Sequence, residues 1–130
     1  MEMTKKAQEI KTLVEAKFFV QQRLGGIERD ASNPHYRNKY ATLEAVWNTL
    51  RPVLGECGLV ITQSPGYITD NHLEVRTKLQ LVGSDDVEEY VSEAPLQKRD
   101  AQGVGSNITY MCRYSLMAIF GLPPVDDDGV

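Results

Sequence analysis

The 130-residue sequence lacks any apolar run that could cross a membrane, because no stretch approaches the roughly 18 consecutive apolar residues that a spanning helix needs. A secretory signal is missing as well. The first residues, MEMTKKAQEIK, carry charges where such a signal has its apolar core. We therefore expect a cytoplasmic protein that is not bound to membranes.

Motifs for catalysis and metal binding are also absent. The sequence has no HExxH or GxSxG motif and no nucleophile placed beside a base. Cys57 and Cys112 lie far apart without CxxC spacing, and neither His35 nor His72 lies near a cysteine in a finger-like pattern. We expect two reduced thiols, no metal, no cofactor and a protein that is not an enzyme.

Positive charge is scarce, with 14 lysines and arginines against 18 acidic residues and a net charge of −4. The acidic residues cluster in segments 85–93 and 126–128. Segments with few acidic residues carry the lysines and arginines Arg37, Lys39, Arg76, Lys78, Lys98 and Arg99. An acidic protein can therefore still carry a basic groove. We expect one domain over residues 1–125, followed by the start of an acidic linker or tail at residues 126–130.

Two helices are predicted in the first half of the chain. Apolar residues at Ala7, Ile10, Leu13, Val14 and Phe18 indicate a helix over Thr4–Leu24, which Gly25-Gly26 ends. A polar connector over residues 27–41 follows, with a turn at Asn33-Pro34. Thr42 can cap a second helix that ends near Gly58, with a kink or break at Pro52.

The second half of the chain reads as three strands and a helix. Strands are predicted over residues 59–63, 72–82 and 87–94, and the middle one alternates apolar and polar residues. A helix over residues 106–120 then ends at Gly121. We expect an α+β fold in which an antiparallel three-stranded β-meander is followed by a C-terminal helix, a β-β-β-α core preceded by two N-terminal helices.

The predicted last helix is apolar almost all round, and Arg113 is its one charged residue. Tyr110, Tyr114 and Met117 share its side of the helix. A fully buried, unpaired arginine would cost several kcal/mol, so Arg113 needs a partner or water. Either an internal acid holds it, or it faces a ligand that carries negative charge and flat rings. Single-stranded nucleic acid is such a ligand.

The connector is a second candidate site, because Tyr36, Arg37, Lys39 and Tyr40 interleave cations with aromatic rings. Such a pattern suits phosphates and unpaired bases. The alternative is a polar loop whose tyrosines pack on the core.

Two further patterns are open to two interpretations. Arg76 and Lys78 project from one strand face about 7 Å apart and could follow a phosphate backbone, or they belong to a solvated face with Glu74 as partner. The turn at residues 103–106 precedes the last helix and could bind phosphate, or Ser106 is simply the helix cap.

Two blocks of sequence resemble a known family. The first is NPHYRNKYATLEAV over residues 33–46, continuing to Leu50-Arg51-Pro52-Val53-Leu54; the second is GSNITY followed by Arg113-Tyr114-Ser115-Leu116 and the acidic run. This pattern resembles the ERF (essential recombination function) family of phage single-strand annealing proteins over roughly residues 8–128.

The resemblance implies a β-β-β-α core that forms rings or filaments and holds single-stranded DNA in a basic groove with the bases outward. It implies pairing of complementary strands without ATP, in the cytoplasm of a bacterial host and alongside a host single-strand binding protein. Lys39, Tyr40, Arg113 and Tyr114 carry the family motifs. Many relatives have two adjacent basic residues before this tyrosine, whereas Cys112 takes the first position here, which is expected to remove one cation from the groove.

The resulting candidate DNA-binding residues are Tyr36, Arg37, Lys39, Tyr40, Arg76, Lys78, Tyr110, Arg113 and Tyr114. The alternative function is an accessory module for replication or recombination that recruits host proteins and binds DNA weakly.

Overall fold

Three antiparallel strands and the helix that follows them form the centre of the fold. The computed structural model describes residues 9–29, 31–33 and 38–125. Its elements in chain order are α2 (Leu13–Arg23), β1 (Ile27–Glu28), β2 (Ala31–Asn33), β3 (Asn38–Tyr40), α3 (Leu43–Cys57), β4 (Leu59–Thr69), β5 (His72–Leu81), β6 (Val87–Pro95), α4 (Ala101–Phe120) and β7 (Pro124–Val125). The predicted α+β class, with a three-stranded meander before a C-terminal helix, is confirmed.

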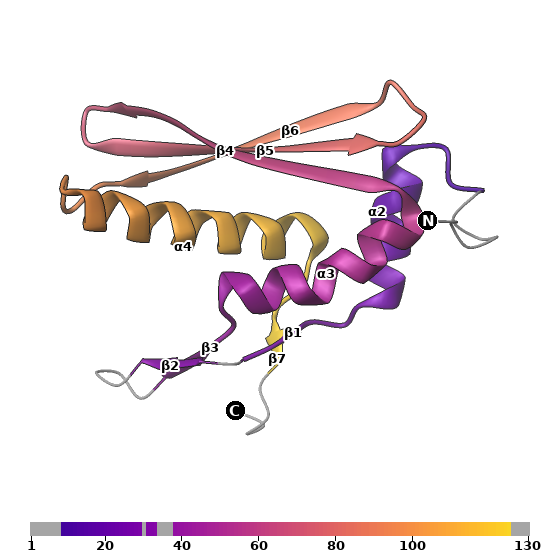
Figure 1. Ribbon diagram of the computed structural model, residues 1–130, viewed down its shortest axis with the longest axis horizontal. Coiled ribbons are helices and arrows are strands. Elements are labelled where there is room, and N and C mark those ends of the chain that lie inside the picture. The colour runs from indigo at the N-terminus through magenta and orange to yellow at the C-terminus, as the bar shows by residue number, and fades with distance from the viewer. Residues whose placement is uncertain (1–8, 30, 34–37, 126–130) are drawn as a thin grey trace.

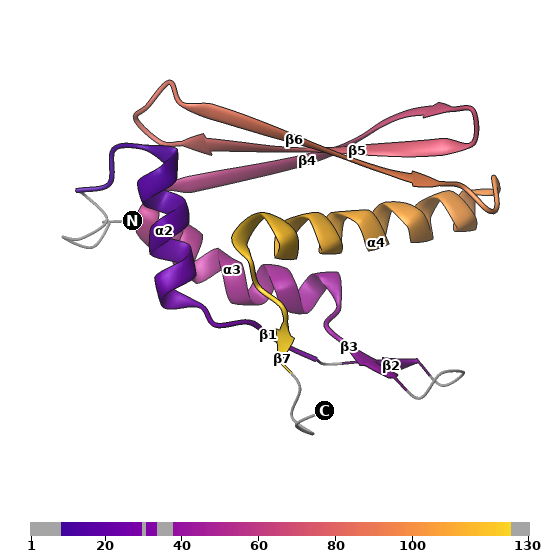
Figure 2. The ribbon, with the colours of Figure 1, turned by 180° about the vertical axis from the view of Figure 1, so that it is seen from behind.

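The elements stack in layers, with α4 between the sheet and α3 (Figure 1). α2 closes one end, where it contacts α3 and approaches the sheet, and the small β2–β3 ladder lies at the start of α3 (Figure 2). In the described part of the chain, no helix is both long enough and apolar enough to span a bilayer.

The sheet has strand order β4-β5-β6, and both ladders are antiparallel. One face of β5 is buried, as the alternation predicted: Leu73, Val75, Thr77, Leu79 and Leu81. β4 and β5 meet at a two-residue turn, Asp70-Asn71, in which both residues have positive φ. Such a turn matches the right-handed twist of the strands that it joins.

Helix α3 follows its predicted pattern. The Thr42 side chain accepts a hydrogen bond from the Ala45 amide, and Gly58 closes the helix in the left-handed conformation with φ 74°. The predicted break at Pro52 is wrong, since the helix is continuous through this residue. Pro52 and Asn48 are both exposed, so water can reach the Asn48 carbonyl that receives no amide from the proline.

Helix α2 is shorter than predicted, and it buries a different face. It begins at Leu13 because the Thr12 side chain accepts a hydrogen bond from the Glu15 amide at 3.1 Å. The buried side chains are Leu13, Ala16, Phe19 and Val20, whereas Val14 is 69% exposed and Phe18 is 60% exposed. The predicted face was therefore wrong at Val14 and Phe18, and residues 1–8 of the predicted helix lie outside the described part.

Helix α4 begins five residues earlier than predicted. The Asp100 carboxylate caps it by accepting a hydrogen bond from the Gly103 amide at 2.7 Å. Gly103 lies against the entering chain, and a Cβ there would come within 2.6 Å of the Lys98 carbonyl oxygen. The two glycines that suggested a turn therefore lie inside the helix, and the first of them is required by this close approach.

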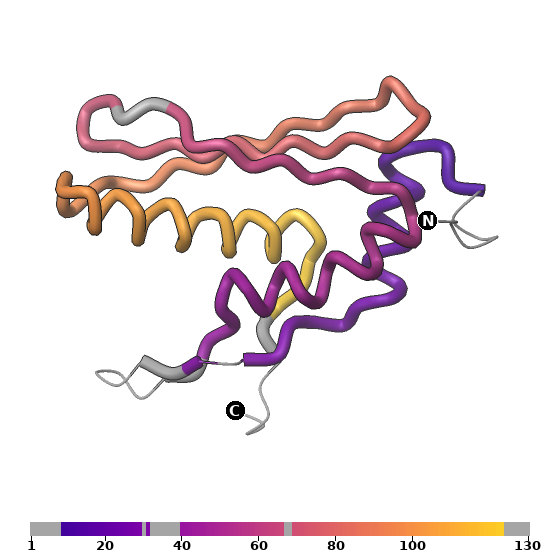
Figure 3. The backbone as a smooth tube through the Cα atoms, in the orientation of Figure 1, coloured from indigo at the N-terminus to yellow at the C-terminus, as the bar shows by residue number. Residues whose placement is uncertain are grey.

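The chain crosses back on itself near its ends. β1 pairs in parallel with β7, and the Ile27 amide donates a hydrogen bond to the Pro123 carbonyl at 3.1 Å. The tube in Figure 3 shows the segment after α4 running down to the segment after α2. Ile27 and Leu122 are both buried, so this pairing fixes the segment that follows α4 against the segment that follows α2.

The buried residues form two clusters along α4. The larger packs α2 and α3 against the end of α4 through Leu116 and Phe120. The smaller holds Leu73, Val75, Leu96, Met111 and Cys112. Between them lies a polar seam: Ser92 and Ser115 are hydrogen-bonded at 2.7 Å, and the Gln63 amide donates to the Thr77 hydroxyl and the Cys112 carbonyl. The hydrogen bonds of this seam link α4 to the sheet with a defined geometry.

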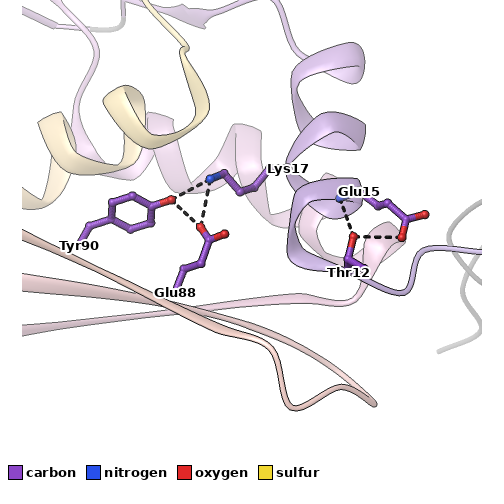
Figure 4. A network of polar contacts seen from close by, with 5 residues as sticks. All are labelled: Thr12, Glu15, Lys17, Glu88 and Tyr90. Carbon is purple, nitrogen blue, oxygen red and sulfur yellow. Dashed lines mark hydrogen bonds and ion pairs between the residues drawn. The ribbon is translucent and has the colours of Figure 1, made fainter.

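A polar network attaches α2 to the sheet (Figure 4). The Lys17 ammonium donates to Glu88 at 3.0 Å and to the Tyr90 hydroxyl at 2.7 Å, and Tyr90 donates to Glu88. The hydrogen bond from Tyr90 and the one from Lys17 lower the pKa of Glu88 below its ordinary value of 4.5. The hydrogen bond to Tyr90 and the pairing with Glu88 raise the pKa of Lys17 above 10.5.

This network predicts a stability that depends on pH. Because the folded pKa of Glu88 is the lower one, its contribution is present above pH 4.5 and is lost as the pH falls through the folded pKa. The contribution of Lys17 is present below pH 10.5 and is lost at higher pH. Urea unfolding of the wild type and Glu88→Gln should show a difference in stability near neutral pH that shrinks in acid. A difference independent of pH would contradict the assignment.

Candidate nucleic-acid interface

Arg113 lies at the centre of a cage of three aromatic rings. Its guanidinium carbon lies 5.0 Å from the ring centre of Tyr40, 5.4 Å from that of Tyr110 and 5.3 Å from that of Tyr114. Two of these rings come from neighbouring turns of α4, and the third comes from the end of β3. Cation–π attraction therefore holds the guanidinium in place without neutralising its charge.

The guanidinium of Arg113 keeps most of its hydrogen-bonding capacity. Its one protein acceptor in the described residues is the Ala41 carbonyl, at a long 3.5 Å. No carboxylate among those residues pairs with it. A guanidinium has five N–H donors, so Arg113, which is only half-buried, has donors left for a ligand.

The cage is open to solvent. Tyr40 is 38% exposed, Tyr110 is 48% exposed and Tyr114 is 53% exposed. The rings of Tyr110 and Tyr114 lie 4.4 Å apart with a 37° angle between their planes. A hydrogen bond with Tyr114 and partial burial raise the pKa of Tyr110 above 10.0, so this hydroxyl stays neutral at physiological pH and does not repel an anion. The cage thus presents a cation and flat rings on one surface.

A pocket of about 460 Å³ opens beside the cage. Arg113 and Tyr114 line it from α4, and the chain after the helix, residues 121–123, forms another part of its lining. Apart from the arginine, its lining is uncharged: Tyr40, Ala41, Tyr114, Met117, Ala118, Gly121, Leu122 and Pro123.

The structure brings four of the predicted residues together: Tyr40, Tyr110, Arg113 and Tyr114. Tyr36 and Arg37 lie outside the described residues. The backbone of Lys39 belongs to β3 and pairs with Ser32, next to Tyr40. The connector before α3, which was predicted to form the site together with the last helix, therefore contributes Tyr40 to it.

Arg76 and Lys78 are not part of this cluster. They lie on the face of β5 opposite its buried residues, and so away from α4. Arg76 donates to Glu74 at 2.9 Å and to Glu89 at 2.7 Å, which neutralises it. The interpretation of a solvated face with Glu74 as partner is the one the structure favours. Lys78 is half-buried on the same face and has no ion pair within the described residues.

Two other expectations concern the groove. Cys112 is buried in the smaller core cluster, and the loss of a cation from the groove at this position stays a prediction. Burial raises the pKa of its thiol. The proposed phosphate turn at residues 103–106 lies within α4, and Asp100 already occupies the Gly103 amide.

No group of three or more histidine, cysteine or acidic side chains that could hold a metal ion occurs in the described ranges.

Comparison with known families decides the assignment. The family model described as the ERF superfamily matches residues 15–130. The chain belongs to the ERF superfamily. Membership of the ERF superfamily supports a DNA-associated role in phage recombination and annealing. No curated protein and no solved structure matches the chain.

In this ERF chain, sequence reasoning missed the pocket wall. Met117 was recognised as a neighbour of Arg113 on the helix, but Ala41, Ala118 and the segment at residues 121–123 were not. The segment at residues 121–123 is placed by the pairing of β1 with β7, which joins residues nearly a hundred positions apart and leaves no local signal.

Proposed function

We propose that the protein binds single-stranded DNA at the Arg113 cage and anneals complementary strands without ATP. The observation that carries the proposal is a guanidinium held among three exposed rings with no acidic partner in the described residues. Phosphate would accept from the free N–H groups, while unpaired bases would stack on the tyrosines. The free energy of annealing comes from base pairing, so the proposal assigns no catalytic residue and no cofactor.

Affinity must come from several subunits acting together. Each chain offers few cations to the strand, and its net charge is −4. A ring or filament would align many cages along one strand, so that every contact after the first is intramolecular. Binding should weaken steeply with salt, since each phosphate contact on a single strand changes log K by about −0.7 per log unit of salt. A host single-strand binding protein is a proposed partner that would deliver or compete for the strand.

A second function has support in the surface of α2. An accessory module that recruits host proteins would need an exposed apolar contact, and Val14 and Phe18 offer one. The negative net charge also favours this alternative over strong DNA binding.

Annealing of two complementary labelled oligonucleotides at low salt and without ATP tests the proposal. The protein should accelerate their pairing, and the acceleration should decrease as salt is added. Measuring the mass of the protein with and without a single strand should show an assembly of several chains. A protein that leaves the pairing rate unchanged and remains a single chain on the strand would support the accessory role instead.

A further inference from the structure

The pocket beside the Arg113 cage has the composition of a site for a flat apolar group. Its other lining residues on α4 and on the segment after it are small or apolar, while its polar side chains are Tyr40, Tyr114 and Arg113. At about 460 Å³ it lies within the usual range of roughly 300–1,000 Å³ for ligand pockets. Such a lining can stack on a flat ring and exclude water from it. It has few groups that could recognise the hydrogen-bond donors and acceptors of a particular ring.

The pocket is preformed. Gly121 ends α4 with φ 65°, and the Leu122 amide donates back to the Met117 carbonyl at 2.8 Å. Leu122 is buried, and the Pro123 carbonyl accepts from the Ile27 amide. Two hydrogen bonds and a buried leucine therefore fix the part of the pocket wall formed by residues 121–123, and a ligand would not have to order it.

We infer that this pocket receives one unpaired base of each strand segment bound at the cage, while Arg113 holds a neighbouring phosphate. The inference rests on the proposed function and names the group that fills the pocket. A nucleotide carries negative charge and a flat ring on one unit, and the pocket combines a guanidinium that has no acidic partner among the described residues with an otherwise uncharged lining. An apolar side chain of a second copy would fill the cavity but would leave the guanidinium without a partner.

The inference predicts a preference for single strands over duplex. A base within a duplex enters such a pocket only after unpairing and unstacking, which costs a few kcal/mol. Because the lining offers few hydrogen-bonding groups, all four bases should enter with similar affinity. One base of each bound segment is thus withheld from pairing until the strand leaves the cage.

Filling the pocket tests this arrangement. Ala118 is exposed on α4 and lines the pocket, so Ala118→Phe should occupy the space with little effect on the core. Ala101→Phe makes the same change at an exposed position of the same helix, outside the pocket and about three turns away from Arg113, and serves as the matched control. Stacking contributes about 1–3 kcal/mol per base. Ala118→Phe should therefore weaken binding of a short single strand roughly five- to a hundredfold, with an unchanged salt slope.

Two probes report on the base itself. Oligonucleotides with one 2-aminopurine should change fluorescence on binding to the wild type and to Ala101→Phe, but not on binding to Ala118→Phe. A strand with regularly spaced abasic sites should bind the wild type less tightly than the intact strand does. Ala118→Phe should bind the two strands equally. The abasic comparison on the wild type needs no variant, so it holds even if Ala118→Phe folds poorly.

The outcomes separate this inference from the proposed function. If Arg113→Gln loses binding while Ala118→Phe and the abasic strand bind like their references, the cage binds DNA and the pocket takes no base. If Ala118→Phe changes the mass of the assembly rather than the fluorescence signal, a second copy fills the pocket and the inference is wrong. If the wild type binds no single strand at all, both proposals are overturned.

Discussion

Replacing Arg113 with glutamine is expected to weaken single-stranded DNA binding roughly ten- to a hundredfold. A hydrogen bond to a charged group contributes about 1.5–3 kcal/mol, and each 1.4 kcal/mol changes Kd about tenfold. Glutamine keeps a polar side chain, but it is shorter and lacks the charge that attracts phosphate and rings. The salt dependence should also become shallower, because one phosphate contact per subunit is lost. Fluorescence anisotropy across a salt series measures both effects.

Arg76→Gln is the matched control, because it removes the same charge from the other face of the sheet. Arg76 is already neutralised by Glu74 and Glu89, so its loss should change affinity by less than the loss of Arg113. Thermal unfolding should show that both variants are folded. Equal effects of the two substitutions would mean that net charge, rather than the cage, governs binding.

Phe120→Ala should lower the free energy of unfolding by about 3–5 kcal/mol, the usual range for removing a buried aromatic side chain. Phe120 is fully buried and belongs to the larger core cluster, where α2 and α3 meet the last turn of α4. Its removal leaves a cavity at the junction of three helices. Because the adjacent Leu122 forms part of the pocket wall, DNA binding should weaken as well.

Urea denaturation measures this loss, with Val14→Ala as the control. Val14 is 69% exposed on α2, so its truncation should change stability by no more than about 0.5 kcal/mol. A loss below 1 kcal/mol for Phe120→Ala would show that the neighbouring helices collapse into the space, and the helical junction would then be less well packed than described.

The alternation of apolar residues and the helix-capping residues predicted β5 and α3 correctly. The alternation from Leu73 to Leu81 placed β5 and its buried face correctly, because side-chain period and burial agree along a central strand. Thr42 and Gly58 marked the ends of α3 for the same reason. The start of α4 was misplaced because two glycines suggested a turn, whereas the nearby Lys98 backbone requires the first of them.

The candidate site was predicted in part. Tyr110, Arg113 and Tyr114 are neighbours on one helix, so their spacing alone predicted the cluster. Tyr40 was expected there from the family resemblance and its basic surroundings. The pairing of Arg76 with Glu89 depends on the register between β5 and β6, and that register cannot be read from either strand alone.

The polar seam between α4 and the sheet has a consequence for the direction in which Arg113 points. Successive residues of a helix point about 100° apart, so turning α4 by one position in one direction would place the Arg113 guanidinium where Cys112 is now buried. Such a rotation would break the directional hydrogen bonds that Gln63 and Ser92 make with this helix. The seam therefore adds to the burial of Met111, Leu116 and Phe120 in keeping the one charged side chain of α4 outward.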